Sequence, residues 1–179
     1  MAWTKEQVVR HLTPPPGIVM PPYPKERDRL YRLALYAVAL GLFGEAAGVL
    51  SASAPLDFAA QGFTAAIAVL ASVTFLVWLG SWRWTVRVLA ALGLVLWPLW
   101  PLGGWAAALA ALAIMAAKET HCFHFPAGRL IPWASLLWGI LLVVLPPARY
   151  EGFGWLAIAA LWLWLAWDRS RLPLFEIHG

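Results

Sequence analysis

Apolar stretches recur along the chain between short polar breaks, and six of them are long enough to form helices. They cover residues 30–50, 58–79, 86–100, 103–117, 130–146 and 153–168. A helix needs about 20 residues to cross the hydrocarbon core of a bilayer. The third and fourth stretches are shorter, so a single re-entrant hairpin is the alternative for this pair. Because Ala-rich helices packed among others can span when slightly short, the pattern predicts an all-α bundle of six transmembrane helices.

The first 29 residues follow a different pattern, with no apolar core, so we do not expect a signal peptide. Thr4 and Gln7 have the spacing of a capping box, which predicts a short helix as far as about Leu12. Prolines then recur, and since proline cannot continue a helix, we expect an extended arm. This arm could lie equally well on the membrane surface or against a partner. The predicted divisions are residues 1–29, a transmembrane domain at 30–168 and a tail at 169–179.

Composition and charge add a location and an orientation. The chain is 62% hydrophobic and 12% charged, whereas a soluble domain carries about 25% charged residues. With the N-terminus inside, Arg149 is the only one of the 13 Lys and Arg residues in a predicted outer loop. This positive-inside bias predicts cytoplasmic termini and a multi-pass protein of the inner (plasma) membrane. Anchoring beside anionic lipid accounts for the net charge of +4, so we expect the lipid bilayer and not nucleic acid as partner.

Small residues and deep tryptophans indicate close helix contacts. Gly44 and Gly48 form a Gly-x-x-x-Gly pair, and such residues let helix backbones approach within a membrane. We prefer packing inside the bundle to an intermolecular contact. Trp138, Trp162 and Trp164 lie deep in predicted spans, where they pack between helices or face a partner.

Glu45 is the only acidic residue well inside a predicted span. Such a residue is costly in hydrocarbon and faces a bundle interior, a cavity or a partner. One interpretation is a proton acceptor or cation ligand of a small transporter. We favour the other, a hydrogen-bonded carboxyl group near the outer end of its helix, because other polar residues in the spans are few.

Residues 118–126, Lys-Glu-Thr-His-Cys-Phe-His-Phe-Pro, are the only place where the sequence gathers several side chains able to do chemistry. His121 and His124 are three residues apart, so both rings project to one side of a helical turn. With Glu119 or Cys122 they make a candidate three-ligand set for zinc or another transition metal. Imidazoles at a membrane boundary could also bind haem. The cofactor is therefore unknown, with a metal or haem as the possibilities.

A structural interpretation of the same stretch competes with the metal site, and we prefer it. In this interpretation Lys118 and Glu119 end the fourth helix, Phe123 and Phe125 dip into the bilayer, and residues 126–128 reverse the chain. The chain has no Gly-x-Ser-x-Gly elbow, phosphate-binding loop or dinucleotide-binding motif. We therefore predict no catalytic residue and lean away from an enzyme.

The stretch Lys118-Glu119-x-x-Cys122-Phe123, followed by a proline-containing turn and another apolar helix, carries a resemblance. It resembles an uncharacterised family of small multi-span integral membrane proteins of bacteria and cyanobacteria. The resemblance covers residues 30–168 and implies a fold without an activity. More loosely, the size and layout are similar to the small accessory membrane subunits of cytochrome bc-type complexes in some thermophiles. The chain has no Asn and only two Gln, a thermophile tendency.

Three functions follow as hypotheses. The first is a non-catalytic accessory or assembly subunit of a larger membrane complex, with respiratory electron transport as the favoured setting and other membrane subunits as partners. The second is a membrane-bound metal- or haem-binding protein that uses Glu119, His121, Cys122 and His124. The third is a small transporter that uses Glu45.

Overall fold

The fold is entirely helical in the part of the chain that the structure describes. The computed structural model describes residues 4–12, 17, 22–77, 79–145 and 150–177. Within these ranges there are seven helices, no strand and one isolated bridge between Tyr23 and Ile177. The all-α fold class is confirmed. Most of the proline-rich arm, Trp78 and Arg149 lie outside the described residues.

Six long helices follow one short one. They are α1 (Lys5–Leu12), α2 (Lys25–Leu50), α3 (Ala54–Thr74), α4 (Gly80–Leu96), α5 (Pro101–Phe123), α6 (Pro126–Val144) and α7 (Tyr150–Ser170). Each helix from α2 to α7 contains most of one predicted apolar stretch. Four of them, α2, α3, α5 and α6, are long and apolar enough to cross a membrane, which identifies a membrane protein by length and composition.

The short helix α1 begins at the predicted capping box. The backbone N–H of Gln7 donates to Thr4 Oγ1 at 3.2 Å, and the backbone N–H of Thr4 donates to Gln7 Oε1 at 2.9 Å. These reciprocal bonds satisfy two donors that the start of a helix leaves free.

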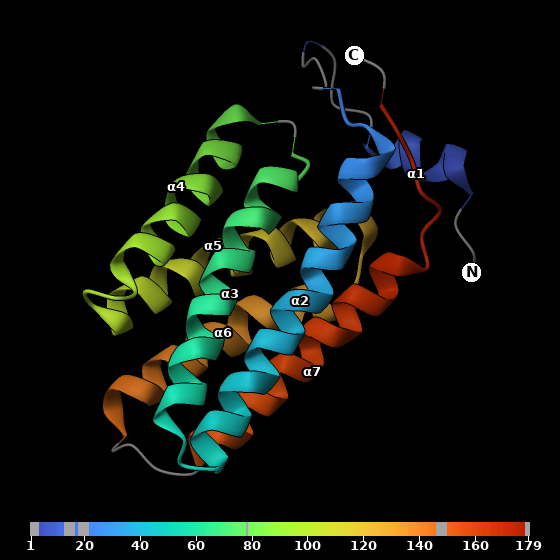
Figure 1. The fold of residues 1–179 in the computed structure, drawn as a ribbon. Coiled ribbons are helices and arrows are strands. Elements are labelled where there is room, and N and C mark those ends of the chain that lie inside the picture. The colour runs from blue at the N-terminus through green and yellow to red at the C-terminus, as the bar shows by residue number, and fades with distance from the viewer. Residues whose placement is uncertain (1–3, 13–16, 18–21, 78, 146–149, 178–179) are drawn as a thin grey trace.

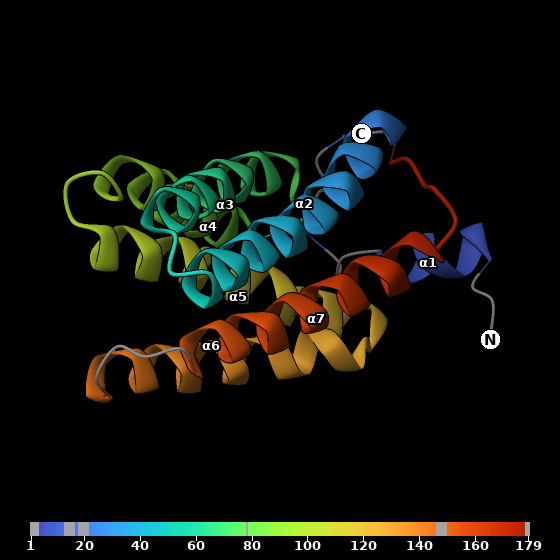
Figure 2. The same cartoon turned by 60° about the horizontal axis from the view of Figure 1, so that its bottom comes forward.

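The six long helices pack as a closed ring in which neighbours follow chain order. Each contacts the next, α7 returns to α2, and α5 also contacts α3 across the ring. Figures 1 and 2 show α3 and α4 on one side of the bundle and α6 and α7 on the other. The first and last long helices are therefore neighbours, although they lie far apart in the sequence.

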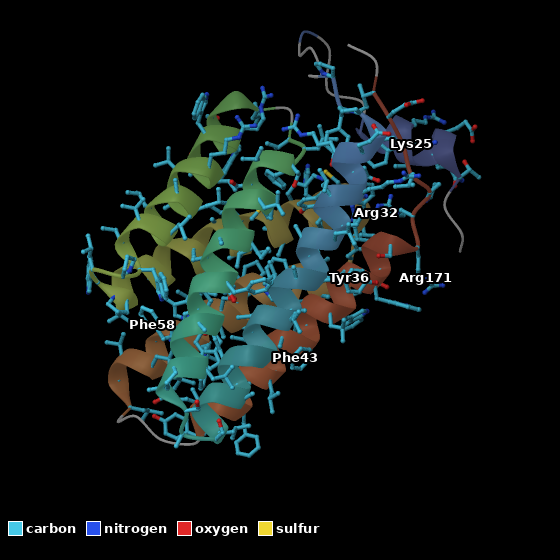
Figure 3. All side chains as sticks on the ribbon, in the orientation of Figure 1. Lys25, Arg32, Tyr36, Phe43, Phe58 and Arg171 are labelled. Atoms are coloured by element: carbon cyan, nitrogen blue, oxygen red, sulfur yellow. The ribbon has the colours of Figure 1, made fainter. Side chains whose placement is uncertain are left out.

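One end of the bundle gathers most of the charged residues, and we call it the polar end. It contains the start of α2, the α3–α4 and α5–α6 connections, and the end of α7. The Arg27 side chain on α2 donates to the carbonyl of Val73 near the end of α3. Lys25, Arg32 and Arg171 lie at this end in Figure 3. The segments predicted to share one side of the membrane thus lie together.

The predicted turn at residues 118–126 is wrong in its extent. Helix α5 continues through Phe123, and only His124 and Phe125 separate it from α6. His124 adopts a left-handed conformation with φ 57°, and its N–H donates to the carbonyl of Thr120 at 2.8 Å. Proline is favoured in the first turn of a helix, so Pro126 starts α6 and does not reverse the chain. Phe123 and Phe125 are buried in the protein and do not dip into the bilayer.

The small residues of α2 pack inside the bundle, as preferred from the sequence. A Cβ added to Gly48 would lie 2.6 Å from the backbone N of Asp57 on α3, and one added to Gly44 would lie 3.0 Å from Ala60 Cβ. Among the deep tryptophans, Trp162 and Trp138 are buried, whereas Trp164 is 44% exposed. The first two are thus core residues, and the third is available to lipid or a partner.

Candidate functional site

Five charged side chains form a buried group at the polar end, and we call it the ion cluster. Its members come from α2, α5 and α7: Asp28, Arg32, Lys118, Glu119 and Arg169. The side chains of Asp28, Glu119 and Arg169 are fully buried. Charged residues are almost never fully buried unless they are paired, so the pairing of this group decides what it can do.

Arg169 lies at the centre of the ion cluster. Its Nη2 is 2.7 Å from Asp28 Oδ1 on α2, and its Nε is 3.5 Å from Glu119 Oε2 on α5. The guanidinium also lies over the rings of Phe123 and Phe175, 4.7 and 5.3 Å from their centroids. Arginine stacks favourably on aromatic faces while pairing with carboxylates. One side chain of α7 therefore holds α2, α5 and the C-terminal segment.

Arg32 extends the ion cluster to the C-terminal segment. Its Nη2 is 2.6 Å from Asp28 Oδ2, one helical turn away. It also donates to the carbonyls of Leu172 at 2.6 Å and Pro173 at 3.0 Å. The segment that follows α7 is thus fixed by hydrogen bonds to α2.

Tyr23 pairs with the same C-terminal segment from the other side. Its backbone exchanges two hydrogen bonds of 3.0 Å with Ile177, and its ring stacks on Phe175 with the centroids 5.6 Å apart. Burial raises the pKa of the Tyr23 phenol above its ordinary value, which keeps the group neutral. The segments before α2 and after α7 are therefore joined at the polar end.

Lys118 completes the ion cluster from α5. Its Nζ is 3.1 Å from Glu119 Oε1, and the ammonium lies over the rings of Phe75 and Phe123. With two acids and three bases, the formal charge of the ion cluster is 3 − 2 = +1. Both carboxylates are thus paired, and the ion cluster is built to hold helices together.

The structure does not bring the four predicted metal ligands together. Glu119 points to Lys118 and Arg169, and Cys122 is buried, whereas His121 and His124 are exposed. Among the described residues, no group of three or more His, Cys, Asp or Glu side chains is placed to hold a metal ion. For these four side chains to bind one metal ion, the end of α5 would have to rearrange. The metal site stays a prediction, which elemental analysis of the purified protein tests.

Glu45 faces the interior between α2 and α3. It is fully buried, and its Oε1 accepts a hydrogen bond from Thr64 Oγ1 at 3.3 Å. The same hydroxyl is 2.9 Å from the carbonyl of Ala60, and Ser72 and Thr74 also donate to carbonyls of their own helix. These hydroxyl groups are used within α3. Thr64 is the one of these hydroxyl groups that is hydrogen-bonded to Glu45, and Asp57 of α3 lies within electrostatic range of the carboxyl group.

Sequence reasoning missed the most important residues of this site. In the sequence, Asp28, Arg32 and Arg169 look like ordinary charged anchors, because they lie at the ends of apolar stretches. Two signals could have identified them. Asp28 and Arg32 have the i, i+4 spacing of a helical ion pair, and Arg32 falls inside the first predicted span, where a charge needs a partner.

Comparisons of the chain with protein-family models, with curated proteins and with solved structures give no match. The resemblance carried by residues 118–123 therefore stays a prediction, and the function has to be argued from the geometry.

Proposed function

We propose that this protein is a non-catalytic accessory or assembly subunit of a larger membrane complex. The observation that carries the proposal is the ion cluster. Lys118 and Glu119 are the base and the acid of the stretch that looked most reactive in the sequence. In the ion cluster they pair with each other, and Glu119 also pairs with Arg169. Breaking a buried ion pair of this kind is strongly destabilising, so we assign these two side chains to the fold. A subunit of this kind functions by binding other membrane proteins through its outer surface.

The outer surface of the bundle offers a face on which the proposed partner could pack. Helix α6 exposes a row of large apolar side chains: Leu130, Trp133, Leu136, Leu137, Ile140, Val143 and Val144. Membrane helices associate through packing and not through the hydrophobic effect. A rigid bundle with an apolar face of this kind can contact lipid or the helices of another subunit equally well.

The proposed placement is an inner membrane with six spans and the polar end in the cytoplasm. Its support is the positive-inside bias of the sequence together with the gathering of Arg27, Arg32, Lys118 and Arg169 at one end. The setting we favour is a respiratory electron-transfer complex of the cytochrome bc type. This setting rests on similarity of size and layout alone.

Extraction of the tagged protein from its native membrane with a mild detergent tests the proposal. We expect larger membrane subunits to co-purify in a fixed ratio, because the exposed apolar face of α6 is then covered by protein. Mass spectrometry of the purified complex would identify those subunits, and a harsh detergent that separates them provides the control. Recovery only as a free monomer under the mildest conditions would contradict the proposal.

A further inference from the structure

A cavity of about 360 Å³ opens at the polar end beside the ion cluster. One wall is the α3–α4 connection, with Phe75, Val77 and Leu79. The other is a face of α5 that runs from Ile114 to Cys122 and includes Lys118 and His121. This volume lies within the range of about 300–1,000 Å³ that is usual for small-molecule sites. The α3–α4 wall is apolar, which suits a hydrocarbon chain.

Three arginines lie around the same connection. Arg27 on α2 is hydrogen-bonded to the carbonyl of Val73 and lies within electrostatic range of Arg83 and Arg87 on α4. The guanidinium of Arg87 lies over the ring of Trp84, and its Nε is buried without a hydrogen-bond partner in the described structure. Like charges within electrostatic range repel one another, and an anion beside them relieves that repulsion.

This chain does not supply that anion from the residues that the structure describes. All nine acidic residues of the sequence fall within the described ranges. The ion pairs recorded there use Arg32, Lys118 and Arg169, and none uses Arg27, Arg83 or Arg87. We call these three side chains the arginine group. They form a positive site with no acidic partner among the described residues.

We propose that the arginine group and the neighbouring cavity together bind one anionic phospholipid of the bilayer. The phosphate contacts Arg27, Arg83 and Arg87, and one acyl chain enters the cavity along the α3–α4 connection. Guanidinium groups match the geometry of phosphate oxygens, and basic pockets between membrane helices suit anionic headgroups. Leu79 and Trp82 line the cavity and are 46% and 47% exposed, so the cavity is open toward the surroundings.

The apolar cavity favours a lipid over a free anion. Inorganic phosphate would satisfy the arginine group but leave the space beside Phe75 and Ile114 unfilled. A zwitterionic headgroup would bring its own cation beside three arginines. An anionic lipid of the phosphatidylglycerol type fits both parts of the site.

Native mass spectrometry of the full chain tests this site. The purified protein is offered phosphatidylglycerol or phosphatidylcholine with the same acyl chains. We expect one phosphatidylglycerol retained per chain, bound at least about tenfold more tightly than phosphatidylcholine, a difference of about 1.4 kcal/mol. The double substitution Arg83→Gln with Arg87→Gln is expected to remove that preference. Arg129→Gln with Arg171→Gln, which removes two exposed basic residues of the same end, is the matched control.

A second experiment tests the role of the cavity. Ala117→Phe on the α5 wall is expected to lower phosphatidylglycerol binding at least fivefold while the arginine group is intact, and an unchanged thermal midpoint shows that the variant is folded. Equal binding of the two lipids would overturn the site, as would equal loss in the control variant, which indicates unspecific attraction. Displacement of the lipid by millimolar inorganic phosphate alone would show a soluble-anion site instead.

Discussion

Arg169→Met is expected to destabilise the protein by about 1–3 kcal/mol, the cost of removing one hydrogen-bonding partner from buried polar groups. The substitution keeps an unbranched apolar stem and removes the guanidinium that lies 2.7 Å from Asp28 and 3.5 Å from Glu119. Both of these carboxylates are fully buried. Each carboxylate keeps one cationic partner, Arg32 or Lys118, but loses its contact with α7. The polar end is therefore expected to loosen, and the yield of folded protein in the membrane to fall.

Thermal unfolding in a fixed detergent measures this effect. The matched control is Arg171→Met, which removes the same charge from an exposed residue two positions away; surface substitutions of this kind usually change stability by less than about 0.5 kcal/mol. If Arg169→Met unfolds at the same temperature as Arg171→Met, the pairing that we describe does not stabilise the fold.

Gly48→Ala is the second large effect that we expect. The added Cβ would lie 2.6 Å from the backbone N of Asp57 and 2.7 Å from its Cα. These are main-chain atoms of α3 and cannot rotate away, so α2 and α3 must move apart. Overpacking of this kind costs about 1–3 kcal/mol, and the thermal midpoint in detergent should fall accordingly.

Gly139→Ala supplies the matched control for that experiment. Gly139 lies within α6, and a Cβ added there meets no atom within 4 Å. Since alanine is the better helix former by about 1 kcal/mol, this variant should be as stable as the parent protein or more so. Equal losses for the two alanine variants would show that the close contact between α2 and α3 is wrong.

The helices could be predicted because each one depends on a pattern of residues that are close together in the sequence. Apolar runs separated by Pro and Gly located all six long helices, and the capping box located α1. Where a helix begins with polar residues, the apolar pattern predicts a start that lies several residues after the true one. Helix α2 begins at Lys25, five residues before the predicted span, because its first turn is charged and pairs with distant partners.

The ion cluster could not be predicted in the same way, because its partners are far apart in the sequence. Asp28 and Arg169 are separated by 141 positions, and only the packing of the first long helix against the last brings them together. The polar residues at 118–121 looked like an exit from the membrane for the same reason. The burial of Glu119 depends on its pairing with Arg169 of α7, which no local pattern reveals.

We expect the charges of the polar end to hold α2, α5 and α7 together, and a double-mutant cycle on Asp28 and Arg169 tests this most directly. The unfolding free energies of Asp28→Asn, Arg169→Met and the double variant are compared with that of the parent protein. For residues in direct contact we expect a coupling of about 1–3 kcal/mol, so that the double variant loses less than the two single losses combined. Losses that add within about 0.3 kcal/mol, as for independent sites, would contradict this expectation.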